Sequence, residues 1–374
     1  MTWYASRLGD VLTLKRGHDL PDAQRQDGDV PVVSSSGVTG RHSEPKAKAP
    51  GVVTGRYGTL GQVFYVEEDY WPLNTALYVT DFKGNHPRFI AYFLKNVLQS
   101  YQSDKAAVPG VNRNVLHELR VRCPDTTVQE RIADILAAYD DMIENNQRRM
   151  ALLEEAAQHL YREWFARLRY PGYEHARITN GVPEGWEKIP TPAAVEVNPS
   201  TRLSSEAEHW SVEMADLPTN SMVIQQATKR EGRSGSKFRN GDTLFARITP
   251  CLENGKTAFV DFLEEGDVGR GSTEFIVLRA RRVTPEYVYC LARTYEFREN
   301  AIKSMIGSSG RQRVQERCFD KFSVLVPSNG LLSLFTDFVR PLFRQVKSLH
   351  AQNQKLGAVR DLLLPRLMSG EIAV

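Results

Sequence analysis

The sequence contains no apolar run that approaches the ~18 residues needed to cross a membrane. Its first residues lack the basic segment followed by an apolar segment that marks a secretory signal. Only 4 of the 374 residues are cysteine, and no two of them form a Cys-x-x-Cys pair. These absences argue against a membrane span, a zinc site and a disulfide framework, and they predict a protein of the reducing cytoplasm.

A strong excess of charge is also missing, since the formal net charge is only +3. Such a mildly basic chain permits nucleic-acid binding through local patches but does not require it. Hydrophobic residues make up 41% and charged residues 25%, which is typical of a globular protein. The length predicts roughly two domains of ~100–200 residues each.

Motifs that carry catalysis are absent or damaged. The segment 250–257 resembles a phosphate-binding loop, but Pro250 replaces its first glycine and has no N–H to offer a phosphate. Glu253 and Lys256 are one residue too far apart for the usual carboxylate-lysine pair of a nuclease. No Gly-x-Gly-x-x-Gly follows a predicted strand, no Asn/Asp-Pro-Pro-aromatic tetrad occurs, and the 8 histidines are dispersed. The sequence therefore predicts no catalytic, cofactor-binding or metal site in this chain.

What the sequence does contain is an internal repeat. Trp3 and Trp186 open two halves, and each half ends in a strand-like run that leads to a proline. Two copies are too few for a solenoid, so the repeat indicates a tandem duplication with a pseudo-two-fold relation. The matching segments are 61–66 with 255–260, 74–79 with 272–277, 87–94 with 285–292, and 119–124 with 322–327.

A long helical pattern follows each half. For the first helix, Thr127 and Glu130 have the spacing of a capping box, and the pattern continues to about Leu168. The second helix is expected to begin near Ser328 or Asn329 and to bend at an internal proline, Pro341. The predicted apolar seams are Ile132, Ile135, Tyr139, Met142, Leu153, Ala157 and Leu160 in the first helix, and Phe335, Val339, Leu342, Val346, Leu349, Leu356, Leu363 and Leu367 in the second.

Each helix taken singly is also typical of a bundle helix or a dimerisation rod. Two matching seams in one chain favour the two helices packing against each other, antiparallel. Asn146 and Asn353 occupy seam positions near the middle of their helices. A polar residue in a seam costs stability but can fix register, so we expect these two asparagines to approach each other. The alternative is that each faces solvent at a slightly rotated seam.

These patterns predict an α+β fold. Two tandem α/β domains with mainly antiparallel sheets are separated and followed by long helices that pair as an antiparallel coiled coil, with pseudo-two-fold symmetry. The predicted boundaries are 1–125 for the first domain, 126–168 for the first helix, 169–185 for a linker, 186–328 for the second domain, and 329–374 for the second helix and tail.

Basic and amide-bearing segments recur at matching points of the two halves. The stretch 227–239 is rich in Gly, Ser and cations, so it predicts a loop that is either simply solvated or lies along phosphates. Arg and Gln beside glycine suit base edges, because their forked groups match guanine and adenine. The candidates are Lys229, Arg230, Arg233 and Lys237 in that stretch; Arg311, Gln312 and Arg313; Asn112 and Arg113 at the equivalent place; Ser35, Ser36 and Arg41 in a hydroxyl-rich loop; and Arg56 and Arg247 after glycine-started strands.

In combination these motifs resemble the specificity subunits of Type I restriction-modification enzymes. The segments 247–256, 271–275 and 307–314 look like a second target-recognition domain of that family, and 55–61 with 71–75 looks like a first one. The ending 362–372 is similar to the family's tail, so the resemblance covers essentially the whole chain. It adds, as residues implied to contact DNA, Tyr57, Thr59, Asn74, Thr75, Thr249, Asn254, Lys256, Ser272 and Thr273.

The resemblance implies a subunit that reads DNA and has no catalytic centre. Each domain would read one half of a split site on double-stranded DNA, and the helices would set the distance between the halves. Two modification subunits would methylate adenine with S-adenosylmethionine, and a restriction or motor subunit would use ATP and magnesium to cut. No membrane partner is expected. The alternatives are an interaction scaffold with duplicated protein-binding domains and an atypical nuclease.

Overall fold

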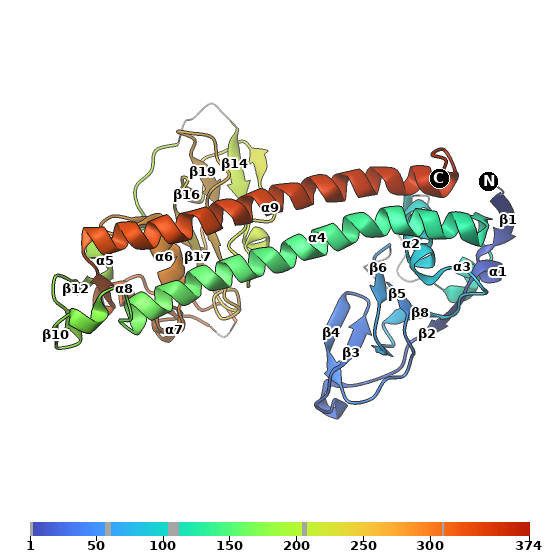
Figure 1. The fold of residues 1–374 in the computed structure, drawn as a ribbon, viewed down its shortest axis with the longest axis horizontal. Helices are drawn as coiled ribbons and strands as arrows, with labels where there is room; N and C mark the ends of the chain where they lie inside the picture. Colours follow the sequence, from blue (N-terminus) through green and yellow to red (C-terminus); the bar gives the residue numbers. More distant parts are fainter. Residues whose placement is uncertain (1–2, 57–60, 104–111, 204–207, 309) are drawn as a thin grey trace. The chain divides into compact units, whose positions relative to one another are not determined.

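The structure is a computed structural model that describes residues 3–56, 61–103, 112–203, 208–308 and 310–374. Its contacts divide the chain into unit 1, Met1–Glu144 with Gln354–Val374, and unit 2, Asn145–Asn353. Each unit combines one mixed α/β domain with part of two long helices, α4 (Thr126–Tyr161) and α9 (Asn329–Ser369) (Figure 1). None of the helices in the described ranges is long and apolar enough to cross a membrane.

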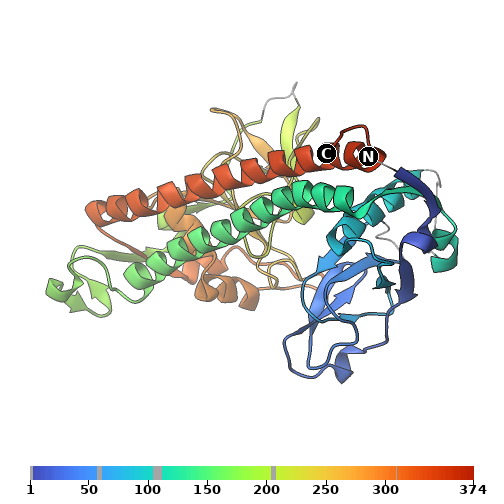
Figure 2. The same ribbon diagram turned by 45° about the vertical axis from the view of Figure 1, so that its right-hand side comes forward.

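Unit 1 is built on a four-stranded antiparallel sheet and a smaller three-stranded sheet. Its elements before α4 are β1 (Trp3–Arg7), α1 (Leu8–Val11), β2 (Thr13–Arg16), β3 (Val30–Ser34), β4 (Gly37–His42), β5 (Gly51–Gly55), β6 (Val63–Val66), β7 (Trp71–Pro72), β8 (Ala76–Asp81), α2 (Pro87–Ser103), α3 (Arg113–His117) and β9 (Arg120–Pro124). The sheets have the orders β2-β8-β5-β6 and β4-β3-β7, and β1 pairs with β9. Helix α2 packs between the larger sheet and the helices α4 and α9 (Figure 2).

Unit 2 repeats this plan. Its elements before α9 are β10 (Ile178–Thr179), β11 (Val182–Pro183), β12 (Glu187–Pro190), α5 (Thr191–Ala194), β13 (Val195–Val197), β14 (His209–Val212), β15 (Thr228–Arg230), β16 (Ser236–Phe238), β17 (Thr243–Ala246), β18 (Thr257–Phe259), β19 (Gly269–Gly271), β20 (Phe275–Ala280), α6 (Pro285–Ala292), α7 (Tyr295–Lys303), α8 (Cys318–Lys321) and β21 (Ser323–Val326). The order β13-β20-β17-β18 corresponds to β2-β8-β5-β6, and the pair β12-β21 corresponds to β1-β9. A second sheet, β15-β14-β19-β16, contains a parallel pair, as β3 and β7 do in unit 1.

The strand order of the two units confirms the predicted internal repeat. The predicted match of 74–79 with 272–277 is wrong by one residue, however. The Arg56 amide donates to the Thr75 carbonyl, and the Arg247 amide donates to the Glu274 carbonyl, so Glu274 is the counterpart of Thr75. The sequence match had instead aligned Thr75 with Thr273. It followed the identity of two threonines, whereas strand pairing follows the backbone ladder and the buried residues that open β8 and β20.

The start of α4 also differs from the prediction. Asp125, and not Thr127, caps the helix, because its carboxylate accepts a hydrogen bond from the Val128 amide at 3.0 Å. The neighbouring side chain of Gln129 is buried, and its amide group donates to the Asn85 side-chain oxygen at 2.7 Å. The prediction that Thr127 caps this helix is therefore wrong.

The seam of α4 is partly as predicted. Ile132 and Ala157 are buried, whereas Ile135 and Met142 are 37% and 46% exposed. The early turns bury Leu136 in place of Ile135, because this face of the helix packs against α2. The helix ends in one π-helical turn, Arg162–Ala166, which buries two further aromatic residues.

The seam of α9 agrees better with the sequence pattern. Phe335, Val339, Val346, Leu349 and Leu367 are all buried, and the helix continues through the internal proline. The predicted linker, residues 169–185, contains a short hairpin formed by β10 and β11.

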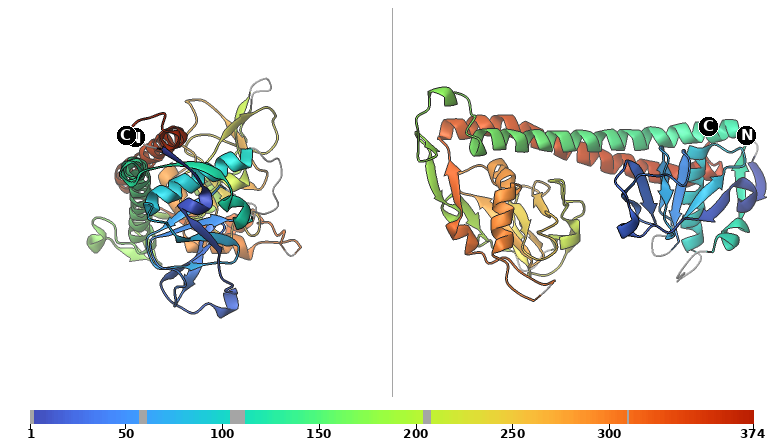
Figure 3. Two further views of the ribbon diagram at one scale, coloured as in Figure 1. Left: turned by 90° about the vertical axis from the view of Figure 1, so that its right-hand side faces the viewer. Right: turned by 90° about the horizontal axis from the view of Figure 1, so that it is seen from below.

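The two long helices run antiparallel within each unit. In unit 1, Asp140 on α4 accepts a hydrogen bond from Arg360 on α9 at 2.5 Å. In unit 2, Trp164 near the end of α4 meets Phe335 near the start of α9, with ring centroids 6.0 Å apart. Sequence numbers thus rise along one helix as they fall along the other, as the sequence predicted. Figure 3 shows the pairing from two further sides.

A buried carboxylate ties α4 to the domain of unit 2. Glu154 is 4% exposed and accepts hydrogen bonds from the Tyr289 hydroxyl at 2.5 Å and the Met222 amide at 2.7 Å. Burial raises the pKa of Glu154, while the hydrogen bond from Tyr289 opposes that rise. Satisfying both oxygens makes this carboxylate tolerable in the core and fixes the helix against the domain.

Candidate nucleic-acid interface

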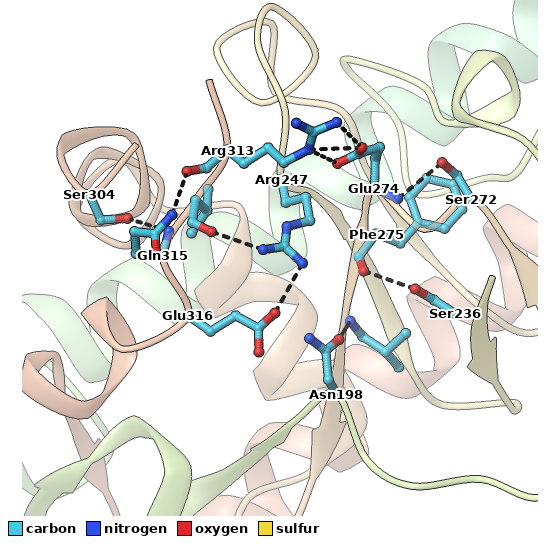
Figure 4. A network of polar contacts seen from close by, with 12 residues as sticks. Asn198, Ser236, Arg247, Ser272, Glu274, Phe275, Ser304, Arg313, Gln315 and Glu316 are labelled. Atoms are coloured by element: carbon cyan, nitrogen blue, oxygen red, sulfur yellow. Dashed lines mark hydrogen bonds and ion pairs between the residues drawn. The ribbon is translucent and has the colours of Figure 1, made fainter. Parts of the chain in front are cut away.

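A cluster of arginines and carboxylates forms in unit 2 where β17 ends and β20 begins. Arg247 follows β17, and Glu274 precedes β20, so the antiparallel pairing of these strands brings the two residues together. A returning segment around Arg313 closes the cluster, because Arg313 forms isolated bridges with both Ile248 and Ile306. Segments far apart in the sequence thus meet at one edge of the sheet (Figure 4).

Arg313 and Glu274 form a forked ion pair. The Nε of Arg313 donates to Glu274 at 2.9 Å and its Nη2 donates to the same carboxylate at 2.6 Å. The Arg313 side chain is 48% exposed and that of Glu274 is 23% exposed. The pair is therefore held in one geometry but remains open to a ligand from solvent.

Arg247 is engaged differently, because the segment after Arg313 surrounds it. Its Nη1 donates to the Glu316 carboxylate at 3.1 Å and its Nη2 donates to the Val314 carbonyl at 3.2 Å. Two residues further along the chain, the Thr249 hydroxyl accepts a hydrogen bond from the Gln312 amide at 3.1 Å. Arg247 and Thr249 thus position the backbone that carries Gln312 and Arg313.

Other predicted residues of unit 2 lie around this cluster. The Ser272 hydroxyl accepts from the Glu274 amide at 3.1 Å, which orders the turn before β20. Lys256 reaches away from the cluster to the Met214 carbonyl at 2.7 Å. Asn254, Thr273 and Arg311 are exposed.

The basic stretch of unit 2 is not a single loop as predicted. It contains the strands β15 and β16, which form opposite edges of the sheet β15-β14-β19-β16, so its cations are spread apart. Two of them have side-chain partners: Arg230 pairs with Glu213 at 3.2 Å, and Lys229 lies 5.3 Å from the Trp210 ring centre. Arg233 and Lys237 donate to backbone carbonyls. Gly and Ser favoured a loop by composition, but pairing with β14 and β19 overrode that preference.

Unit 1 carries the equivalent cluster with Thr75 in the place of Glu274, and the Asn74 side chain there donates to the Asp19 carboxylate. The Asn74 carbonyl accepts from both Arg56 and Arg16, each at 3.4 Å. The Ser35 amide donates to the Thr75 hydroxyl at 3.4 Å. Four predicted residues, Ser35, Arg56, Asn74 and Thr75, are thus brought together beside the exposed Arg16, which the sequence analysis did not select.

The remaining predicted residues of unit 1 lie in other places. Ser36 and Arg113 are exposed, and Arg41 donates to the Asp29 carbonyl. Asn112 is the N-cap of α3, where its side chain accepts from the Asn114 amide at 3.0 Å. Tyr57 and Thr59 lie outside the described residues.

Glu274 and Glu316 were also missed by the sequence analysis. A carboxylate in a cationic segment reads as an unfavourable neighbour for phosphate, so composition gives no reason to select it. The only available signal was the place of Glu274 inside the motif 271–275. Among the described residues there is no group of three or more His, Cys, Asp or Glu side chains that could hold a metal ion.

Comparison with known proteins finds similarity to one family. A family model described as the Type I restriction modification DNA specificity domain matches residues 1–155. The MjaIX specificity subunit of Methanocaldococcus jannaschii is 22% identical over 290 residues, which cover 73% of this chain and 65% of that protein. The EcoEI specificity subunit of Escherichia coli is 29% identical over 155 residues, or 40% of this chain and 26% of that protein. Each match thus spans less than two thirds of the relative's length.

The fold is also similar to that of a solved structure. The S subunit of a Type I restriction-modification system from M. genitalium superposes with a TM-score of 0.59 at 14% identity, covering 98% of this chain and 96% of that one. At this level of identity the likeness concerns the fold, namely two α/β domains joined by long helices. The family model and the curated relatives show that residues 1–155 match the DNA specificity domain and that the chain is similar to Type I restriction-modification specificity subunits.

Proposed function

We propose that this chain is the non-catalytic subunit that reads a two-part sequence on double-stranded DNA and directs adenine methylation and ATP-dependent cleavage by partner subunits. The observation that carries the proposal is the duplicated cluster. Arg56 with Thr75 and Arg247 with Glu274 stand at the same place on two domains, each beside hydroxyl and cationic groups. Phosphate contacts from such cations would set register, and amide and guanidinium groups would read base edges.

The division of labour in the proposal follows the predicted boundaries. Residues 1–125 and 186–328 would be the two readers, 126–168 and 329–374 the helices that space them, and 169–185 the connection. Two modification subunits using S-adenosylmethionine and a motor subunit using ATP and magnesium would assemble with the chain in the cytoplasm. Because Thr75 and Glu274 are equivalent but chemically different, the two readers would recognise different half-sites.

The test is whether specificity is modular. The chain is expressed with its modification partner, and methylated adenines are mapped across the host genome. Replacing Arg56 or Arg113 with alanine should alter only one half of the methylated sequence, and replacing Arg311 or Gln312 should alter only the other. Each lost base contact is expected to cost about 1–3 kcal/mol at its own base pair.

Several outcomes would contradict the proposal. Equal changes in both halves would exclude separate readers. An assembled complex with no preference among DNA sequences would favour a protein-binding scaffold. Metal-dependent cleavage by the purified chain alone would identify a nuclease.

The helix pair offers an independent prediction. The Asn146 amide group donates to the Asn353 side-chain oxygen at 2.9 Å, as the seam positions predicted, and Asn146 is only 8% exposed. Replacing either asparagine with leucine leaves the other without this partner, so each single change should lower the free energy of unfolding by about 1–3 kcal/mol. The double replacement should cost less than the sum of the two, with a coupling of about 0.5–3 kcal/mol.

A register role predicts more than stability. In the double leucine variant the helices lose the polar contact that disfavours a shifted pairing, and each residue of slip moves a helix by about 1.5 Å. Methylation should therefore become less selective for the spacing between the half-sites even where the protein is stable. The exposed neighbour Asn145, changed to leucine, serves as the matched control. Additive single effects and unchanged spacing would refute the role.

A further inference from the structure

The guanidinium of Arg313 has two hydrogen-bonding edges, and the structure uses only one of them. Nε and Nη2 form the side-on edge, and both donate to Glu274. Nη1 makes no hydrogen bond with any residue that the structure describes, so the end-on edge of Nη1 and Nη2 keeps free N–H groups. This edge presents two parallel donors on a side chain that is 48% exposed (Figure 4).

Arg247 provides the contrast within the same cluster. Its end-on edge is occupied by Glu316 and by the Val314 carbonyl, and its side chain is only 24% exposed. Its Nε is buried without a partner among the described residues. Both terminal nitrogens of Arg247 therefore donate within the protein, whereas the end-on edge of the exposed Arg313 is open to a ligand.

Stability does not explain the ion pair of Arg313. Pairs that are this exposed contribute little to folding, because solvent screens their attraction. An exposed arginine is nevertheless costly to order, because its side chain loses much rotamer freedom when it binds a ligand. Glu274 has already restricted that freedom in the unbound protein, so the pair is better explained by binding than by folding.

We infer that Arg313 reads a guanine through its end-on fork and that Glu274 is the positioning residue that aims it. This inference rests on the proposed function. Guanine presents its O6 and N7 acceptors side by side in the major groove, and a bidentate arginine matches them. The carboxylate in turn discourages a phosphate at this spot, since it would lie close to a second anion. Arg313 is thus assigned to a base rather than to the backbone.

The test uses the complex of this chain with its modification partner and duplexes that carry the mapped recognition sequence. Each guanine of the half-site read by unit 2 is replaced, one at a time, by 7-deazaguanine, which lacks the N7 acceptor. At one position the wild-type complex should lose about 5- to 150-fold in affinity. Arg313→Ala and Arg313→Lys should both become insensitive to that replacement, because lysine keeps the charge but lacks the fork.

Glu274→Gln should reduce the preference for that guanine while the contacts of the Glu274 backbone are kept. The matched control is Glu187→Gln, which disturbs another exposed, forked arginine–carboxylate pair of unit 2, that of Arg282, and should leave the same preference unchanged. Circular dichroism and a melting curve confirm that each variant is folded.

Two results would overturn the inference. If Arg313→Ala weakened binding to all sequences equally, Arg313 would be a phosphate contact. If Glu187→Gln altered the guanine preference as much as Glu274→Gln, the effect would come from a general disturbance of unit 2. A wild-type complex without any sequence preference would instead refute the proposed function itself.

Discussion

Replacing Phe335 with alanine is expected to lower the free energy of unfolding of unit 2 by about 3–5 kcal/mol. Phe335 is fully buried and lies at the centre of an aromatic cluster that joins both long helices to the domain. Its ring centre is 4.9 Å from that of Phe165, 6.0 Å from that of Trp164 and 6.4 Å from that of Tyr287. These rigid rings, which come from the end of α4 and from α6, cannot collapse into the space that the phenyl group leaves, so the loss includes a cavity as well as transfer from water.

Urea denaturation followed by tryptophan fluorescence measures the effect, since Trp164 lies in this cluster. Phe338 is the matched comparison, because it is on the same helix but 56% exposed and contacts the cluster through the Trp164 ring at 6.2 Å, so its replacement should cost no more than about 1.5 kcal/mol. In the assembled enzyme, Phe335→Ala should weaken recognition of the half-site read by unit 2 more than that of the other. Equal costs for the two phenylalanines would contradict the assignment of this cluster as the main anchor.

Replacing Arg279 with methionine is expected to cost about 3–5 kcal/mol, because it strands a buried charge. Arg279 lies on β20 and donates from Nε and Nη2 to the two carboxylate oxygens of Asp242 at 2.8 and 2.7 Å. The Asp242 side chain is 1% exposed and that of Arg279 is 10% exposed. Without Arg279, the carboxylate would keep one further donor, the Arg239 amide at 2.8 Å. The pair thus ties β20 to the turn before β17, the two strands that present Glu274 and Arg247.

Hydrogen exchange of the β17 and β20 amides provides a local measurement of this loss. Arg281→Met, at an exposed position two residues further on, should change the protection by no more than about 0.5 kcal/mol. Combining Asp242→Asn with Arg279→Met removes the stranded charge, so the double variant should recover most of the stability. A single Arg279 variant as stable as the double one would show that the pair does not hold the strands.

The domains of the two units share a scaffold but differ in the groups that they present. In unit 1 the carbonyl of Asn74 gathers Arg16 and Arg56, whereas in unit 2 the carboxylate of Glu274 holds Arg313. The Asn74 carbonyl is only a weak acceptor for Arg16 at 3.4 Å, whereas the Glu274 carboxylate holds Arg313 at 2.6 Å, so we expect Arg16 to be more adaptable than Arg313. The expected consequence is a more stringent reading of the half-site assigned to unit 2.

Local patterns in the sequence determined the duplication, the strands, the two long helices and the seam of α9. These features follow from periodicities of two and of three to four residues, which depend on residues close together in the chain. The meeting of Asn146 and Asn353 could also be predicted, because two antiparallel helices with matching seams leave little freedom of register.

Only the tertiary structure decided which side chains form the two arginine clusters. Arg313 and Glu274 are separated by 39 residues, and nothing in either local segment indicates that a carboxylate will hold that arginine. The same holds for the burial of Leu136 in place of Ile135, which depends on α2 covering one face of α4. Strand pairing likewise separated cations that composition had grouped in one loop. In each case the deciding contact comes from a distant part of the chain, so a pattern read along the sequence does not contain it.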